Sequence, residues 1–242
     1  NKHVEFARRS FAGALALATI ASLAQFLSGD FSSKIVARYQ PAKLAAMEGL
    51  FTTQPAAPLS LVGWPDEEQQ ELKYDVSLPG MLSWLIHGDT QKTVPGLDVL
   101  APQWGTPPVW LSFQAYHLMV AIGSLFILST LYASWLRLRG KLFQKRWLLW
   151  YFVLAVVPAM LANQLGWATA EVGRQPWIVY PTMVDGQLVG GLRTAAALSE
   201  VVGAEQVLGS IIMFAVLYGV LFLLWIIILN QKIQHGPEAK ET

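Results

Sequence analysis

A long apolar run ends in the stretch GWATAEVGRQPW, residues 166–177. No charged side chain occurs from Trp147 to Ala170, and a run of that length can span a membrane. Glu171 therefore lies at, or just inside, the boundary between lipid and water, where an ionised acid needs a partner. On its own the stretch is typical of a helix end, with Arg174 as that partner and the flanking tryptophans in an aromatic belt.

The composition is that of an integral membrane protein. Hydrophobic residues make up 54% of the 242 residues and charged residues only 14%, against about 25% charged in soluble domains. A net charge of +1 and the lack of a basic stripe argue against nucleic-acid binding. The chain has no cysteine, which excludes disulfides, thiolate nucleophiles and cysteine-ligated metal centres. The chain begins with Asn1 rather than Met, and its first residues do not form a signal peptide. We therefore expect the chain to begin within a longer polypeptide or to come from a split gene.

Four apolar stretches have membrane-spanning length. The predicted fold class is therefore an all-α integral membrane protein with four transmembrane helices. Along the chain we predict a lead and first span at 1–30, a large loop at 31–108, a second span at 109–136, a basic connection at 137–146, a third span at 147–170, a mixed segment at 171–205, a fourth span at 206–230 and a tail at 231–242.

The distribution of basic residues predicts the orientation of these spans. The N-terminus, the connection at 137–146 and the tail hold ten of the seventeen Lys and Arg residues. Cytoplasmic connections are enriched in Lys and Arg, so both ends of the chain are predicted to be cytoplasmic. The loop at 31–108 and the segment at 171–205 then face the outer side.

The large loop carries signs of structure of its own. Residues 41–50 and 81–87 are predicted to form short helices, and the prolines within 53–58 break the first of them. Lys43 and Glu48 are five residues apart, so on a regular helix they diverge by roughly 140°. They are either two solvated charges or the two flanks of a small polar headgroup.

Several motifs together resemble subunit I of the cytochrome bd-type quinol oxidases. They are KLAAME at 43–48 with TQP at 53–55, GWPD at 63–66, and the stretch 166–177, above all its GRQPW run at 173–177. The resemblance covers nearly the whole chain but only the C-terminal half of the family's subunit, the last four of nine spans. It implies that the loop at 31–108 is a quinol-binding loop of the short kind.

The resemblance implies that Lys43 and Glu48 take part in quinol oxidation. A quinol loses two protons with its two electrons, so a carboxylate near its hydroxyl is a plausible acceptor. A nearby lysine would favour the charged form of that carboxylate. Met119 would be an axial ligand of a low-spin heme b, a soft neutral donor that raises the heme potential. Without the resemblance, a lone methionine in an apolar helix is more often core packing.

The resemblance makes Glu171 the axial ligand of a high-spin heme b. Arg174, one turn later, would neutralise a heme propionate, and Trp167 would pack among the hemes. His117 stands about 200° round a helix from Met119, so both cannot ligate one iron. Many family members carry Arg at this place, so His117 is either a propionate partner or a satisfied core histidine.

No histidine in the chain is a good candidate ligand for the oxygen-reducing heme, which is heme d or a substitute heme b in the family. We therefore expect the chain to act with the N-terminal half of subunit I, on the same or a split chain, and with subunit II, with or without a small single-span subunit. The implied protein is a terminal oxidase of the cytoplasmic membrane of a bacterium or archaeon. It would oxidise quinol at the outer side, reduce O2 to water and contribute to the proton motive force.

Two alternatives come from other classes of protein. The chain could be half of a transporter or channel, with Glu171 and Arg174 as a gate pair. It could also be a heme-less structural paralogue that braces a true oxidase.

Overall fold

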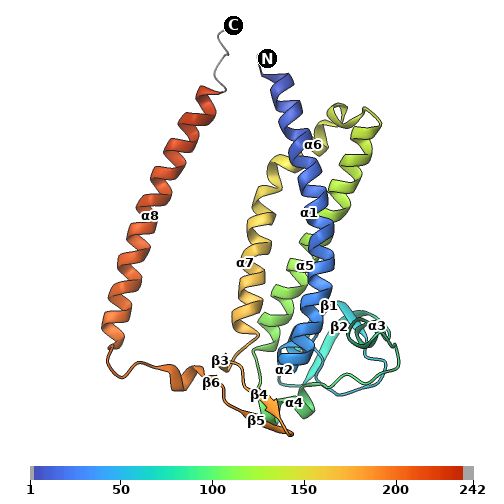
Figure 1. The fold of residues 1–242 in the computed structure, drawn as a ribbon, viewed down its shortest axis with the longest axis vertical. Helices are drawn as coiled ribbons and strands as arrows, with labels where there is room; N and C mark the ends of the chain where they lie inside the picture. The colour runs from blue at the N-terminus through green and yellow to red at the C-terminus, as the bar shows by residue number, and fades with distance from the viewer. Residues whose placement is uncertain (1–2, 237–242) are drawn as a thin grey trace. The chain divides into compact units, whose positions relative to one another are not determined.

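Four helices in the computed structural model are long and apolar enough to cross a membrane (Figure 1). The structure describes residues 3–236, so the expectation about Asn1 lies outside it. The four are α1 (Val4–Tyr39), α5 (Val109–Leu138), the pair α6 (Arg146–Leu154) and α7 (Val156–Val172), and α8 (Ala204–His235). The mostly helical fold with four membrane-length helices is as predicted.

Helix α1 is longer than its apolar stretch at 11–28 indicated. Both flanks carry an ion pair one turn apart, Glu5 with Arg9 and Asp30 with Lys34. Such pairs at i,i+4 stabilise exposed helical turns. The helix therefore continues beyond the residues that hydropathy alone selects.

The third span is interrupted near its start. α6 ends at Leu154 and α7 begins at Val156, and Pro158 stands one turn further on. Proline has no N–H to donate to the carbonyl four residues earlier, here that of Leu154, and its ring crowds that oxygen. The sequence placed Pro158 inside one continuous span, whereas the structure resolves a break there.

The loop between α1 and α5 is a folded layer at one end of α1, α5 and α7 (Figure 1). It contains α2 (Pro41–Met47), strands β1 (Leu59–Asp66) and β2 (Glu71–Leu78), α3 (Met81–His87) and α4 (Leu97–Trp104). The two expected short helices, within 41–50 and at 81–87, are confirmed. The β1–β2 hairpin was not predicted, because Gly63 and Pro65 are poor strand formers.

This layer has its own apolar core. The buried residues come from α2, α3, α4, the turns between them and the start of α5. They are Ala42, Ala45, Ala46, Leu50, Phe51, Ala57, Leu82, Val94, Leu97, Leu100, Trp104 and Val109. Val109 is the first residue of α5, so the core continues onto the membrane helix. The layer is thus fixed to α5 by packing.

A second apolar cluster joins α1, α5 and α6 at the ends of these helices that lie away from the folded loop (Figure 1). It consists of Leu15, Ala133, Leu136, Leu142 and Leu148. Nearby, the hydroxyls of Thr19 and Ser134 lie 2.9 Å apart. These contacts hold α1 against α5 and against the connection to α6.

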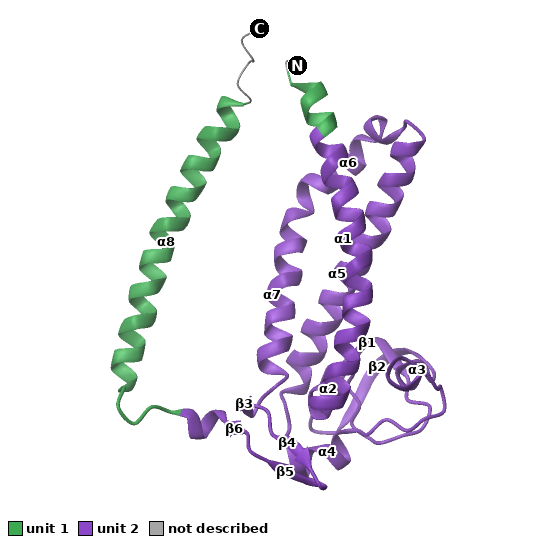
Figure 2. Ribbon diagram, viewed as in Figure 1, with its two compact units in different colours: residues 1–9, 198–242 green, residues 10–197 purple. Residues whose placement is uncertain are grey.

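The segment after α7 forms two small antiparallel pairs. β3 (Trp177–Val179) pairs with β6 (Leu192–Arg193), and β4 (Thr182–Val184) pairs with β5 (Gln187–Val189). Residues 10–197 form one compact unit, and residues 1–9 with 198–242 form another that contains α8 (Figure 2). All the candidate site residues belong to the unit formed by residues 10–197, which Figure 2 labels unit 2.

Candidate functional site

Glu48 is placed by the end of α2. The helix ends at Met47, and Gly49 adopts a left-handed backbone with φ of +63°, which glycine tolerates best. A Cβ at position 49 would lie 3.1 Å from Cδ2 of Phe113 on α5. The absence of a side chain at Gly49 therefore lets the chain turn tightly against α5 and brings Glu48 to that helix.

The Glu48 side chain is buried without a hydrogen bond of ordinary geometry. The residue is 3% exposed, and neither carboxylate oxygen has a hydrogen-bond partner among the described residues. Burial raises the pKa of Glu48 to about 8, and interaction with the Tyr116 hydroxyl opposes that rise. Buried polar atoms are nearly always hydrogen-bonded, so this carboxylate is an exception that points to a missing partner.

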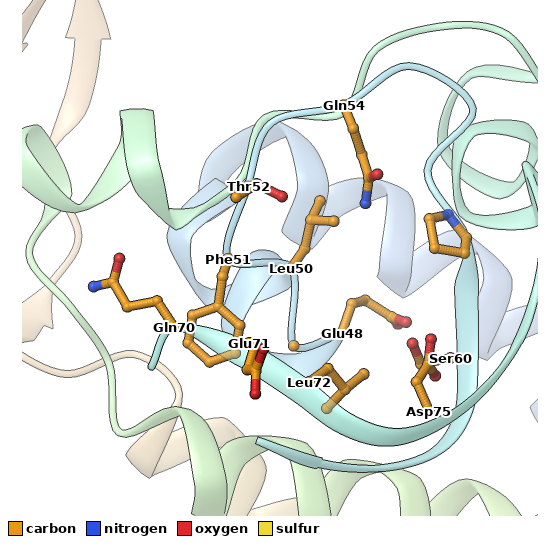
Figure 3. Close-up of a pocket in the computed structure, with 12 residues that line it drawn as sticks. Glu48, Leu50, Phe51, Thr52, Gln54, Ser60, Gln70, Glu71, Leu72 and Asp75 are labelled. Atoms are coloured by element: carbon orange, nitrogen blue, oxygen red, sulfur yellow. The ribbon is translucent and has the colours of Figure 1, made fainter. Parts of the chain in front are cut away.

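A cavity of about 290 Å³ opens beside Glu48. Figure 3 shows the Glu48 side chain extending toward Ser60 and Asp75 of the hairpin. The lining residues are Glu48, Gly49, Leu50, Phe51, Thr52, Gln54, Pro58, Ser60, Gln70, Glu71, Leu72 and Asp75. Leu50, Phe51, Pro58 and Leu72 give this cavity apolar walls, and seven of its twelve lining residues carry polar or charged groups that can bind a small organic ligand.

Lys43 lies in different surroundings from Glu48. It is 8% exposed, and its Nζ donates to the carbonyl oxygen of Ala170 at 3.3 Å. Burial lowers the pKa of Lys43, the Arg174 guanidinium lowers it further, and Glu171 opposes the change. The predicted divergence of Lys43 and Glu48 is therefore observed.

The expectation that a nearby lysine favours ionised Glu48 is not met. Burial raises the pKa of Glu48, the Tyr116 hydroxyl opposes the rise, and Lys43 is not among the groups that act on it. Lys43 instead packs along Gly173, where a Cβ would stand 3.2 Å from Cγ of Lys43. The lysine joins the loop to the stretch at 166–177.

Glu171 and Arg174 form an ion pair one turn apart at the end of α7, between Oε2 and Nη2. Both side chains are about one-third exposed, and the Trp167 residue is 66% exposed. The Arg174 Nε is buried and has no partner among the described residues. The guanidinium thus has donor capacity left over after it binds Glu171.

The end of the GRQPW run packs on α4. Trp177 Nε1 donates to the carbonyl oxygen of Trp104 at 2.5 Å, and the Trp104 and Tyr180 rings stack at 5.4 Å. The Arg193 guanidinium lies 5.0 Å from the centre of the Trp177 ring. These contacts fix the segment that follows Arg174.

Met119 belongs to α5, and its side chain packs against α7. It is half-buried, and a Cβ at Gly166 would stand 2.9 Å from its Sδ. The structure thus brings the candidate thioether ligand against the first residue of the stretch 166–177. Trp167 and Glu171 follow Gly166 on α7.

His117 contacts two backbone carbonyl groups. Its Nδ1 lies 2.9 Å from the oxygen of Phe113, and its Nε2 lies 2.8 Å from the oxygen of Ser60. The ring also stacks on Phe113 at 3.8 Å. Both ring nitrogens of His117 thus lie against backbone carbonyl oxygens, and a neutral imidazole, with a single N–H, can donate to one of them.

Sequence reasoning missed Tyr116 and the two hairpin carboxylates of the cavity, Glu71 and Asp75. Tyr116 precedes a residue that was singled out, and its position one turn before Met119 is the signal that could have found it. The hairpin carboxylates did have a signal that was not used, because residues 71–78, ELKYDVSL, alternate polar and apolar side chains as a strand does.

The residues present fit heme groups. A thioether suits a low-spin heme iron, and Met119 on α5 carries one, packed against Gly166 of α7. Glu171 offers a partly exposed carboxylate, and the unpartnered Nε of Arg174 can donate to a propionate.

The fold and the site define a multi-pass membrane protein with a carboxylate-lined cavity in a folded loop. The family model for cytochrome bd terminal oxidase subunit I matches residues 1–237. The chain belongs to this family, and the resemblance drawn from its motifs is confirmed.

Individual relatives agree with the family match. The chain is 31% identical to the cytochrome bd ubiquinol oxidase subunit 1 of Bacillus subtilis strain 168, over 98% of this chain and 51% of that protein. It is 27% identical to the cytochrome bd-II ubiquinol oxidase subunit 1 of Escherichia coli K12, over 98% of this chain and 57% of that one. The bd oxidase structure from Geobacillus thermodenitrificans aligns with a TM-score of 0.76 and 31% identity, over 95% of this chain and 50% of that one. The chain thus spans about half the length of these relatives.

Proposed function

We propose that this chain forms the C-terminal half of subunit I in a quinol:oxygen oxidoreductase. The observation that carries the proposal is the buried Glu48 carboxylate, which faces a cavity and, among residues 3–236, has only the Tyr116 hydroxyl as a weak partner. A quinol hydroxyl is a partner of the right chemistry, since it donates to a carboxylate and then gives up its proton. The apolar side chains of Leu50, Phe51 and Leu72 supply surfaces for the quinol ring.

Glu48 acts as the proton acceptor in this proposal. A general base works best with a pKa near the working pH, and burial raises the pKa of Glu48 to about 8. Each quinol releases two protons and two electrons, and two quinols reduce one O2 to two waters. Glu48 takes a quinol proton from within the cavity, and Glu71 and Asp75 line the way out of it. Lys43 keeps the loop in place against α7, beside Glu171.

The remaining site residues hold cofactors. Met119 would ligate the low-spin heme b, Glu171 the high-spin heme b, and Arg174 would pair with a propionate beside Trp167. Heme supplies one-electron chemistry when bound. The oxygen-reducing heme, d or a substitute b, would be held outside this chain together with its histidine ligand.

The assembly and orientation follow from the sequence. The basic residues favour cytoplasmic ends, so the cavity faces the outer side of a bacterial or archaeal cytoplasmic membrane. Protons from quinol then leave outward and contribute to the proton motive force. The partners are the N-terminal half of subunit I and subunit II, with or without a small single-span subunit.

Two substitutions in the assembled oxidase test this function. Glu48→Gln should abolish quinol turnover while heme content survives, and Glu171→Ala should remove the high-spin heme spectrum. Glu68→Gln, in the exposed hairpin turn, is the matched control and should behave as wild type. Wild-type behaviour of both site variants would refute the proposal. A pyridine hemochrome assay that finds no heme would favour a transporter or a heme-less paralogue instead.

A further inference from the structure

We propose that His117 is a positioning residue that fixes one wall of the Glu48 cavity to the helix that carries Met119. The inference rests on the proposed function, because it assigns His117 a part in forming the quinol site. It gives a role to a residue that ligates nothing in the scheme above.

The two ring nitrogens of His117 connect different elements. Nε2 reaches the carbonyl oxygen of Ser60 in β1, and Nδ1 reaches that of Phe113 in α5, one turn earlier on its own helix. A carbonyl oxygen only accepts hydrogen bonds. Each hydrogen bond between His117 and one of these oxygens therefore uses an N–H of the imidazole as its donor. The contact to Ser60 ties the hairpin to the membrane helix.

His117 is the last of three residues on one face of α5 that dock the hairpin. Trp110, Gln114 and His117 are spaced by four and three residues, which places them in a row. The Trp110 backbone N–H donates to Glu67 at 2.7 Å, and Gln114 Nε2 donates to the carbonyl oxygen of Gly63 at 2.9 Å. The hairpin is thus held along α5 from its turn to Ser60.

The His117 end of this row borders the cavity. Ser60 is 4% exposed and lines the cavity together with Glu48. On the other side, Phe113 stacks on His117 and packs against Gly49, the neighbour of Glu48. His117 therefore supports both flanks of the cavity, through Ser60 and through Phe113.

The test uses the assembled oxidase with three variants of His117. His117→Leu should raise the KM for quinol about five- to tenfold, as expected for losing one hydrogen bond of a buried group, with kcat and both heme b spectra unchanged. His117→Gln, which keeps one N–H donor group, should give a smaller rise. His117→Arg keeps several donors and should restore a KM near that of wild type. His87→Leu, at the exposed end of α3, is the control.

A second measurement does not depend on quinol. Lys73 lies in β2 of the hairpin, and trypsin should cleave after it faster in His117→Leu than in wild type, while His87→Leu leaves the rate unchanged. Unchanged KM and unchanged cleavage would overturn the proposal, as would loss of the low-spin heme spectrum in His117→Leu. If wild type oxidises no quinol, the proposed function fails. Faster cleavage in His117→Leu would then still support the role of His117 in holding the hairpin on α5.

Discussion

The ammonium group of Lys43 donates a hydrogen bond to the carbonyl oxygen of Ala170, 127 residues further along the chain. That oxygen is among the last four of α7, which have no partner within the helix. A cation at a helix C-terminus also interacts favourably with the helix dipole. Lys43 thus caps, from a distant loop, the helix that carries Glu171.

Under the proposed function, this contact predicts that Lys43 influences the heme that Glu171 would hold as well as quinol turnover. Lys43→Met should change the absorption of the high-spin heme in addition to lowering turnover, because the end of α7 loses its cap. Lys34→Met, in an exposed ion pair with Asp30 on α1, serves as the control. A variant with a higher KM for quinol and an unaltered heme spectrum would show that Lys43 acts on the substrate alone.

Gly173 should not tolerate a methyl group. In Gly173→Ala the new Cβ would stand 2.7 Å from the Thr169 carbonyl oxygen and 3.2 Å from Cγ of Lys43, so we expect a destabilisation of about 1–3 kcal/mol. Gly123→Ala on α5 is the matched control, because its Cβ would meet nothing within 4 Å. There the better helix propensity of alanine should stabilise by up to about 1 kcal/mol. Thermal denaturation midpoints of the two variants should move in opposite directions.

Glu48 should make the stability of the protein fall as the pH rises. Its pKa is about 8 in the folded state against 4.5 ordinarily. Its contribution is thus fully present below pH 4.5 and is lost as the pH rises through 8. Relative to wild type, Glu48→Gln should gain on the order of a few kcal/mol between these limits. Denaturation midpoints from pH 5 to 9 check this, and parallel curves for the two proteins would contradict it.

Asp98 should hold the end of the segment 48–54, which lines the cavity. Its Oδ1 accepts from the backbone N–H and the hydroxyl of Thr53, at 2.9 and 2.7 Å. Asp98→Ala removes both bonds, so amide hydrogen exchange across residues 50–54 should speed up about tenfold. Asp89→Ala, which loses one bond from Gln91, should leave that segment protected. Equal exchange in both variants would refute this role.

Hydropathy predicted the four spans because the length of an apolar run is a local property. The motifs at 43–48 and 166–177 identified the family for the same reason. The contact between Lys43 and Ala170 could not be predicted, since it depends on how the loop folds over α7. The hairpin was not predicted because Gly63 and Pro65 make β1 a poor strand by sequence, although residues 71–78 of β2 alternate polar and apolar side chains.

His117 shows the same limit on a smaller scale. Its position two residues before Met119 was visible, but its partners were not, because one of them is a backbone oxygen 57 residues away. Tyr116 had a local signal, its position one turn before Met119, but its relation to Glu48 depends on how the loop folds against α5. Sequence therefore located the site on the chain, and the structure decided which groups meet.

The spacing of Trp110, Gln114 and His117 along α5 fixes which part of the hairpin each of them contacts. An inserted residue between 110 and 117 would raise the helix beyond it by about 1.5 Å and rotate it by about 100°. The hairpin would then keep its contact with Trp110 and lose the contact with His117. The number of residues between 110 and 117 thus sets where the hairpin and its cavity lie along α5. This segment should tolerate substitutions far better than insertions or deletions.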